Sequence, residues 1–272
     1  WYHIVGTANS GQIQLFVNGV SKGTASNANS INQVINIGAR TANGYWFAGI
    51  VDDVKIYKYA RPPAQIAWDY NKGKPVGSWR FDESSGTACY DDSGNNNGTA
   101  TIGATGTQTT IDAARSNGAT GKFGRCMSFD GTDDVVTKSS PAGMSFSKSN
   151  AMTLEAWFNL TGHSGYDGIV SVVSTGIGEG YARILVDPAL GPYYDIFGAD
   201  QDVAGYTFSQ NTWYHYALTV DGGGSAKIYV NGTQISSSTA GVPSVLEDIT
   251  AVYIGAGESS SSHLTQGLID DV

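Results

Sequence analysis

The sequence predicts an all-β protein, an antiparallel β-sandwich, and three observations support this. Short runs alternate apolar and polar residues with a period of two, as at Ile13, Leu15 and Val17. The 36 glycines and the Asn-Gly pairs supply the tight turns that join such runs. Only residues 64–70 have the pattern of a short helix, so the 40% of hydrophobic residues must form a core between sheets.

The chain repeats part of itself. Trp1-Tyr2-His3 recurs as Trp213-Tyr214-His215, and three later blocks recur in the same order. These are Phe16-Val17-Asn18-Gly19 with Tyr229-Val230-Asn231-Gly232, Ile37-Gly38-Ala39 with Ile254-Gly255-Ala256, and Gly49-Ile50-Val51-Asp52-Asp53-Val54 with Gly267-Leu268-Ile269-Asp270-Asp271-Val272. Insertions lie only between the blocks, where loops between strands tolerate them. We therefore expect each block to be a strand, with a type I′ turn at each Asn-Gly pair.

The segment between the two copies differs from both. Lys55-Ile56-Tyr57 is expected to continue a strand, and Pro62-Pro63 stops it just before the short helix. Residues 71–75 then form a linker. The predicted organisation is residues 1–61, a helix and linker at 62–76, and a second domain at 77–272.

The second domain begins with a new set of strands. Trp79-Arg80-Phe81 is the first, and 127–130, 152–158 and 169–173 follow, with a loop rich in Gly and Asn at 91–98. Many short strands with turns between them are typical of an antiparallel sandwich.

Several blocks of this domain resemble one family. Residues 77–86, 92–99 and 121–134 are similar to the front half of a laminin-G-like domain, and Leu154-Glu155-Ala156-Trp157 together with the repeated blocks is similar to its back half. This resemblance covers nearly the whole chain and implies a concanavalin A-like jelly roll. It implies less about function, because this sandwich occurs in lectins, adhesion modules, carbohydrate-binding modules and some hydrolases.

The resemblance divides unevenly along the chain. Residues 1–61 are similar only to the back half of a domain, and 77–272 to a domain truncated in its last strand. The expectation is one nearly complete domain plus the back half of a preceding one. Since a sandwich needs both sheets, residues 1–54 should lack about half of their core. A preceding segment or a neighbouring molecule would supply the missing strands.

Composition and motifs exclude several function classes. The chain has 15 Lys and Arg against 24 Asp and Glu, a net charge of −9, which argues against a nucleic-acid partner. No apolar run is long enough to span a membrane. The sequence has no Glu-x-Asp-x-Glu, Gly-x-Ser-x-Gly or His-Glu-x-x-His pattern, and we expect no enzymatic activity. His3 and His215 repeat within Trp-Tyr-His and are interpreted as structural.

A structural Ca2+ ion is a further expectation. The resemblance implies that the first and last strands are neighbours and that calcium lies at the rim, which points to Asp82, Asp92, Asp270 and Asp271 as ligands. Carboxylates in loops provide the hard oxygen ligands that calcium requires. The alternative is that these side chains only accept hydrogen bonds from turn and strand-end amides.

Sugar binding requires an aromatic face beside polar groups, because a pyranose offers both C–H surface and hydroxyls. Such residues gather between 163 and 208. The candidates are Tyr166, Asp167, Tyr181, Arg183, Tyr193, Tyr194, Asp195 and Tyr206. Trp1, Trp79, Trp157 and Trp213 are instead expected in the core.

The two cysteines, Cys89 and Cys126, have no metal-binding spacing. They are a disulfide or two buried thiols. The low charge and the many small polar residues suggest an extracellular setting, which favours the disulfide.

Together these features predict a non-catalytic recognition or adhesion module of a large secreted or cell-surface protein, binding glycans or partner proteins. One alternative is a structural repeat unit of an extracellular fibre, stalk or surface layer, completed by neighbouring repeats or chains. A third is an accessory carbohydrate-binding domain of a carbohydrate-active enzyme.

Overall fold

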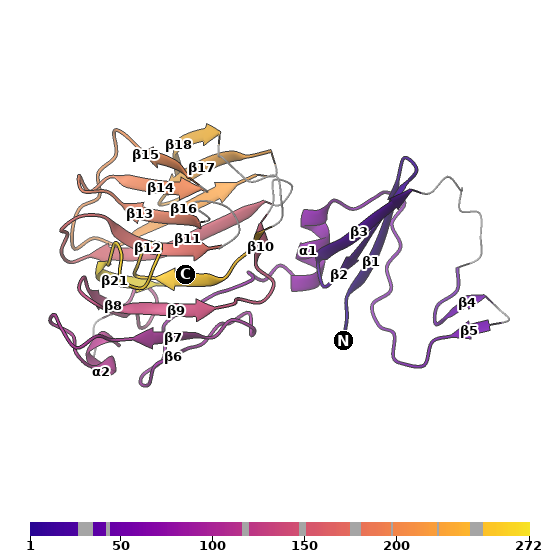
Figure 1. Cartoon of the computed structure of the whole chain (residues 1–272), viewed down its shortest axis with the longest axis horizontal. Helices are drawn as coiled ribbons and strands as arrows, with labels where there is room; N and C mark the ends of the chain where they lie inside the picture. Colours follow the sequence, from indigo (N-terminus) through magenta and orange to yellow (C-terminus); the bar gives the residue numbers. More distant parts are fainter. Residues whose placement is uncertain are drawn as a thin grey trace. The chain divides into compact units, whose positions relative to one another are not determined.

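The computed structural model describes residues 1–26, 35–41, 44–115, 120–146, 151–174, 181–196, 198–221, 223–239 and 247–272. The chain forms two compact units, Trp1–Gly73 and Lys74–Val272, called here the first and second units (Figure 1). Strands make up 43% of the chain and helices 5%, in antiparallel sheets, which confirms the predicted fold class. No helix in the described ranges is both long and apolar enough to cross a membrane.

The first unit contains a three-stranded meander, a small hairpin and one helix. Its elements are β1 (Ile4–Asn9), β2 (Gln12–Val17), β3 (Val20–Ser26), β4 (Ala39–Thr41), β5 (Gly44–Trp46) and α1 (Pro63–Asn71). The helix begins after Pro62 with a proline in its first turn, and ends at Lys72, whose φ of 55° is left-handed. Phe16 of β2 and Ile66 of α1 are both buried.

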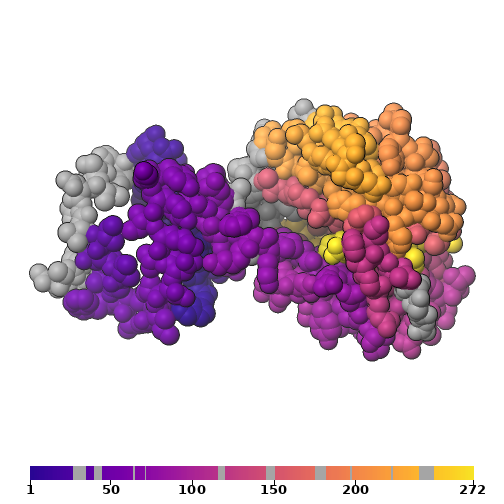
Figure 2. Space-filling model, turned by 180° about the vertical axis from the view of Figure 1, so that it is seen from behind, coloured from indigo at the N-terminus to yellow at the C-terminus, as the bar shows by residue number. Residues whose placement is uncertain are grey.

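The second unit runs from magenta to yellow in Figure 2 and contains most of the strands. Its elements are β6 (Ala88–Cys89), β7 (Gly98–Thr101), α2 (Ile111–Ala114), β8 (Met127–Asp130), β9 (Val135–Ser139), β10 (Ser145–Phe146), β11 (Met152–Leu160), β12 (Asp167–Val173), β13 (Tyr181–Val186), β14 (Pro192–Ile196), β15 (Ala199–Asp202), β16 (Tyr214–Val220), β17 (Ser225–Val230), β18 (Thr233–Thr239), β19 (Glu247–Asp248), β20 (Ala251–Ile254) and β21 (Gln266–Asp270).

Two sheets enclose the core of the second unit. One has six strands in the order β18-β17-β16-β11-β21-β8, and the other has eight in the order β15-β14-β13-β12-β20-β9-β7-β6. Alternate residues of each strand face inward, as Ala156, Phe158 and Leu160 do on β11. Trp157, between two of them, therefore lies on the outer face of the six-stranded sheet.

The repeat is visible in the structure. Strands β1-β2-β3 match β16-β17-β18. The pairing of β2 with β3 shifts register at Leu15/Phe16, and the pairing of β17 with β18 shifts at the matching position, Ile228/Tyr229. Both Asn-Gly turns have positive φ at both residues, 51° and 78° in the first copy and 49° and 77° in the second. These are the angles that a type I′ turn requires, so the predicted turns are confirmed.

The two copies differ in what covers their inner faces. Ile13 and Leu15 of β2 are 39% and 47% exposed, whereas their counterparts on β17, Ala226 and Ile228, are fully buried. The described residues of the 1–54 segment thus leave uncovered the apolar face that the second unit packs against its other sheet.

Several predicted strands do not form among the described residues. Residues 1–3 precede β1, and of residues 37–39 only Ala39 lies in a strand. Residues 49–54 are not a strand, although their counterpart β21 is one, because β21 pairs with β11 and β8 and the described part of the first unit has no such neighbours. Residues 55–57 form no strand for the same lack of a partner. Residues 79–81 contribute only one bridge, between Trp79 and Asp91.

The predicted disulfide is also wrong. Cys89 and Cys126 are both buried, and no disulfide joins them. Cys89 lies in β6 of the eight-stranded sheet and Cys126 directly precedes β8 of the six-stranded sheet, while the Arg115 guanidinium contacts the Cys89 sulfur at 3.4 Å. The second alternative, two buried thiols, is the one the structure has.

Candidate functional site

A row of polar side chains crosses the outer face of the eight-stranded sheet. The strand register places them directly opposite one another, in the order Tyr253, Ser171, Arg183, Asp195, Asp200. Their neighbours along β12, β13 and β14 face the core instead. Strand alternation therefore places these side chains together on the face that points away from the core.

Arg183 is the centre of this row. Its guanidinium lies 3.2 Å from the Asp195 carboxylate and also forms an ion pair with Glu258, from the loop that precedes β21. Glu258 in turn accepts a hydrogen bond from His263 Nδ1 at 2.9 Å. Arg183 and Asp195 are almost completely buried, whereas Glu258 and His263 are about one-third exposed. The loop thus extends a buried charge network toward solvent.

Asp195 on β14 and Asp200 on β15 lie directly opposite each other. Burial, and then the hydrogen bond and charge of Asp200, raise the pKa of Asp195 to about 7, although Arg183 opposes this. Burial also acts to raise the pKa of Glu258, but its hydrogen bonds and the charges of His263 and Arg183 outweigh burial and lower it. Directly opposed carboxylates destabilise a sheet, so the fold alone gives no reason for the pairing of Asp195 with Asp200.

Two tyrosines border the network. The Tyr166 ring packs edge-on against Tyr193 at 5.1 Å and against His263 at 5.4 Å between centroids. Burial raises the pKa of Tyr166, and the charges of Asp202, Asp187 and Asp200 add to this. The face therefore combines a partly exposed aromatic ring with an acidic surrounding.

The structure brings together four of the eight predicted ligand residues, Tyr166, Arg183, Tyr193 and Asp195. Asp167 is buried and pairs with His163 instead. Tyr194 and Tyr206 are not part of this group. Tyr194 faces the core, because it alternates with Tyr193 along β14, and Tyr206 packs on Phe208 and Tyr214. The side chain of Tyr181 lies outside the described residues. Glu258 and His263 were missed, since nothing in their spacing links them to Arg183.

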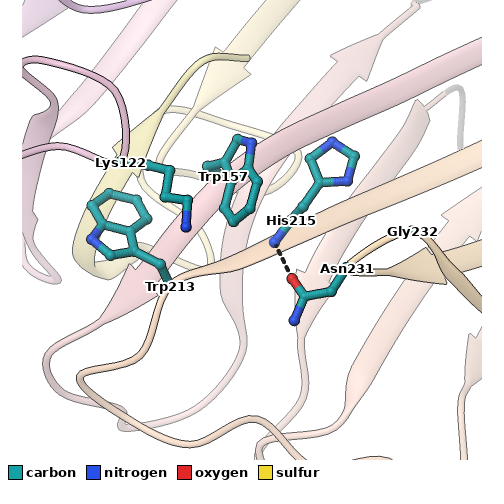
Figure 3. A pocket seen from close by; sticks show the side chains of 6 residues that line it. All are labelled: Lys122, Trp157, Trp213, His215, Asn231 and Gly232. Carbon is teal, nitrogen blue, oxygen red and sulfur yellow. Dashed lines mark hydrogen bonds between the residues drawn. The ribbon is translucent and has the colours of Figure 1, made fainter.

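A separate cavity of about 430 Å3 lies on the outer face of the six-stranded sheet, lined by Lys122, Trp157, Trp213, His215, Asn231 and Gly232 (Figure 3). The Lys122 ammonium is 4.3 Å from the centroid of the Trp157 ring, which also packs against His215 at 5.3 Å. Of the four tryptophans expected in the core, only Trp79 is there. Trp157 and Trp213 are partly exposed on this outer face, and Trp1 is 86% exposed.

A second cavity of about 360 Å3 is lined by Arg80, Phe123, Asp270 and Asp271. Asp270 is fully buried, and its Oδ2 accepts a hydrogen bond from the Phe123 amide at 2.7 Å while its Oδ1 has no partner. Burial raises the pKa of Asp270 to about 6, and the charges of Asp271 and Asp82 contribute. Phe123, which lines this cavity, packs edge-to-face with Trp157, which lines the first one, at 5.7 Å between ring centroids.

The predicted metal ligands do not converge. The first and last segments are neighbours, since Trp79 and Val272 exchange backbone hydrogen bonds. However, the Arg80 guanidinium lies 3.1 Å from the Asp82 carboxylate and 3.7 Å from the Asp92 carboxylate. It occupies the position between them that a metal ion would need. Among the described residues, these acids and Asp270 and Asp271 form no group with three ligand oxygens within 4.8 Å.

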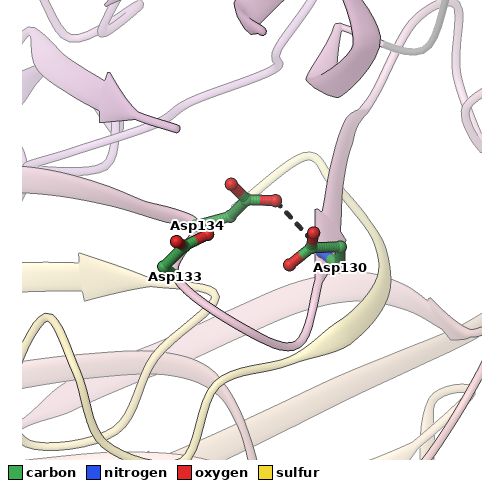
Figure 4. A group of neighbouring side chains, drawn as sticks. All are labelled: Asp130, Asp133 and Asp134. Atoms are coloured by element: carbon green, nitrogen blue, oxygen red, sulfur yellow. Dashed lines mark hydrogen bonds between the residues drawn. The ribbon is translucent and has the colours of Figure 1, made fainter. Parts of the chain in front are cut away.

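Another group of acids does converge and could hold a metal ion. Ligand oxygens of Asp130, Asp133 and Asp134 lie within 4.8 Å of one another, at the turn between β8 and β9 (Figure 4). Backbone amides of Thr107 and Gln108 donate to Asp130, while Asp133 Oδ1 is buried without a hydrogen-bond partner. Burial raises the pKa of Asp134 to about 6, and the charges of Asp130 and Asp133 add to this.

Comparison with known proteins agrees with the fold. The family model described as the concanavalin A-like lectin/glucanases superfamily matches residues 1–67 and 130–272, one match in each repeat. No curated protein sequence gives a significant match. Among solved structures, Trypanosoma rangeli sialidase is similar with a TM-score of 0.50 and 15% identity over 72% of this chain. That match spans only 29% of the sialidase.

Two shorter structures also match. Domain 4 of AbnA, an extracellular GH43 arabinanase from Geobacillus stearothermophilus in complex with arabinotriose, has a TM-score of 0.49 and 18% identity, over 72% of this chain and 89% of its own. The CBM40 domain of a Ruminococcus gnavus sialidase, bound to α2,3-sialyllactose, has a TM-score of 0.38 and 16% identity, over 44% and 71%.

Proposed function

Because this chain belongs to the concanavalin A-like lectin/glucanases superfamily, we propose that it is a non-catalytic recognition module that binds glycans. The ligand face is the outer face of the eight-stranded sheet, at Tyr166, Tyr193, Arg183, Asp195, Glu258 and His263. The parent protein is secreted or displayed at the cell surface, where glycans are available.

One observation carries this proposal: the polar row on that face ends beside an aromatic ring. Tyr166 is partly exposed and could stack on the C–H surface of a sugar, while Glu258 and His263 next to it could bind hydroxyls. Arg183 and Asp195 hold these groups in place from below, which reduces the entropy lost on binding.

The charges around Tyr166 support neutral glycans as the ligand class. Asp187, Asp200 and Asp202 all act on the Tyr166 hydroxyl, and the chain as a whole carries a net charge of −9. A sialylated glycan would bring a further negative charge to this acidic rim and be repelled.

The pairing of the acids supports a non-catalytic role. A glycosidase needs one carboxylate as acid and another as base or nucleophile on either side of the bond. Here Asp195 and Glu258 are both ion-paired with the same arginine. Both are thereby engaged with Arg183.

We also propose that the acidic turn of Asp130, Asp133 and Asp134 binds Ca2+. The buried, unpartnered Oδ1 of Asp133 is a ready ligand, and hard carboxylate oxygens suit this ion. A cation would also offset the burial of the Asp134 carboxylate and its repulsion by Asp130 and Asp133, which together raise its pKa.

The test of glycan binding is a glycan array probed with the full chain, followed by calorimetry of any hit with Tyr166→Ala. We expect neutral oligosaccharides to bind and the substitution to weaken them at least about tenfold. Tyr90→Ala, an exposed tyrosine of the same unit, is the control that should bind normally. An array without neutral hits, or equal binding by both variants, would contradict the proposal.

A structural repeat unit is the second candidate function. The exposed apolar face at Ile13 and Leu15 favours it, because isolated domains rarely leave such a face uncovered. In that case the array would be empty and the chain would associate through its first unit.

A further inference from the structure

Strand β15 forms one edge of the eight-stranded sheet, where β14 is its neighbour among the described strands (Figure 1). Its side chains bury little surface, since Asp200, Gln201 and Asp202 are exposed and Ala199 is half-buried. In contrast, all five residues of β14 are buried. Packing therefore contributes little to the attachment of β15, and contacts of individual side chains decide how firmly this edge is held.

One of these contacts joins two acids. Asp195 on β14 lies directly opposite Asp200 on β15, and their carboxyl groups are within hydrogen-bond reach of each other. Two ionised carboxylates cannot form a hydrogen bond, because neither has a proton to donate. The contact therefore requires one proton. Asp195 is the group that retains it, because Asp195 is fully buried whereas Asp200 is exposed.

One arginine faces this pair of acids. The Arg183 guanidinium on β13 lies 3.2 Å from the Asp195 carboxyl group and also forms an ion pair with Glu258. While Asp195 is protonated, Arg183 balances Glu258, and Asp200 is the one net negative charge of the group. Ionisation of Asp195 adds a second negative charge at a buried position, which is costly.

Other titratable groups also lie near the pair. They are Tyr193 on β14, Asp202 on β15, and Tyr166, Asp187 and His263 on loops. The tyrosines and aspartates bring no positive charge, and the imidazole is already hydrogen-bonded to Glu258. Burial, and then the hydrogen bond and charge of Asp200, raise the pKa of Asp195 to about 7. The proton is therefore lost close to neutral pH.

We infer that the proton shared by Asp195 and Asp200 is a pH-sensitive switch that keeps β15 attached to β14 and releases it when the proton is lost. The inference concerns regulation of the glycan face and rests on the function proposed for that face. Release withdraws the Asp200 carboxylate from the Tyr193 hydroxyl, which donates to it, and Tyr193 is the ring on which Tyr166 packs. Glycans therefore bind more tightly at about pH 6 than at about pH 8.

The experiment measures amide hydrogen exchange by NMR in the full chain without any ligand. Protection factors at pH 6 and pH 8 are compared, since they remove the intrinsic increase of exchange with pH. We expect the protection of Ala199–Asp202 to fall about tenfold, because pH 8 lies about one unit above the transition. The internal control is β18, an edge strand of the other sheet that contains no acid and should keep its protection.

Two substitutions separate the switch from general effects of pH. Asp200→Asn supplies an amide that can donate to ionised Asp195, so β15 protection should become independent of pH and the Asp195 carboxyl, followed by 13C NMR, should titrate at lower pH. Asp221→Asn, at the turn between β16 and β17, should keep the tenfold loss of the unchanged chain. Equal protection of β15 at pH 6 and pH 8, or the same loss in Asp200→Asn and the unchanged chain, would overturn the inference.

Calorimetry with a neutral oligosaccharide at the same two pH values tests the link to binding. Weaker binding at pH 8 in the unchanged chain, and equal binding at both pH values in Asp200→Asn, would support it. Equal affinity at both pH values in the unchanged chain, together with release of β15, would refute the regulatory role. If β15 is released but no glycan binds at either pH, the switch is supported and the proposed function alone is wrong.

Discussion

The two copies of the repeat offer a matched pair of substitutions. Ile228→Ala in β17 and Leu15→Ala in β2 remove the same number of carbon atoms at equivalent register positions. Ile228 is fully buried between two sheets and Leu15 is 47% exposed. We expect the first substitution to cost far more stability than the second.

The magnitudes follow from burial. Ile228→Ala loses the transfer free energy of the deleted groups and leaves a cavity, for about 3 kcal/mol. Leu15→Ala loses roughly half of a leucine transfer free energy and leaves no closed cavity, for about 1 kcal/mol. For a unit of this size each kcal/mol lowers Tm by about 2–4 °C, so Ile228→Ala should lower the Tm of the second unit by about 6–12 °C.

Differential scanning calorimetry of the full chain measures both effects, because the two units have separate cores. Ser237→Ala, on an exposed face of β18, serves as a control for the loss of a surface side chain. If Leu15→Ala were as costly as Ile228→Ala, the inner face of the first unit would have to be covered in solution. If Ile228→Ala lowered Tm by less than about 3 °C, the two-layer packing argument itself would be wrong.

Three further predictions concern charges and thiols. Replacing Asp200 by Asn should stabilise the second unit at pH 8 by roughly 0.5–1 kcal/mol and have little effect at pH 5. The pKa of Asp195 is raised to about 7, so its contribution to the free energy of unfolding falls as pH rises from about 4 to 7. Urea titrations at pH 5 and pH 8 would show whether Asp200 is a cause of this loss. Calcium should raise the Tm of the apo chain, and Asp134→Asn should abolish that increase; an equal increase in both proteins would place the ion elsewhere. Cys89 and Cys126 should resist iodoacetamide in the native chain, because both are buried and burial raises the pKa of Cys89 to about 11. Both should react after unfolding without reductant, because no disulfide joins them. Mass spectrometry that found one oxidised pair instead would contradict this.

The sequence predicts the fold well where the determinants are local. The Asn-Gly turns and the alternating runs specify their own geometry, and both copies have it. The predicted strand at residues 49–54 is absent because a strand also needs a neighbour to pair with, and pairing is not encoded within the segment.

The candidate site is less predictable. Tyr193 and Tyr194 are adjacent and identical in type, yet they lie on opposite faces of β14, and only the register against β13 decides which one faces the core. Glu258 is 75 residues from Arg183 in sequence and meets it only through the loop that precedes β21. The prediction that Trp157 lies in the core was wrong for a related reason, since it faces outward from β11, one of the two central strands of the six-stranded sheet.

The repeated turn also bears on folding kinetics. The β1–β3 meander keeps its turn and its register shift without an opposing sheet, so the contacts that specify it are short-range in sequence. Contacts of that kind lose little chain entropy when they close, and they form before long-range ones. The matching segment of the second unit, from Tyr214 to Thr239, should therefore gain amide protection first in pulse-labelled hydrogen exchange, ahead of β8 and β21, whose pairing must wait for residues more than 130 positions apart to meet.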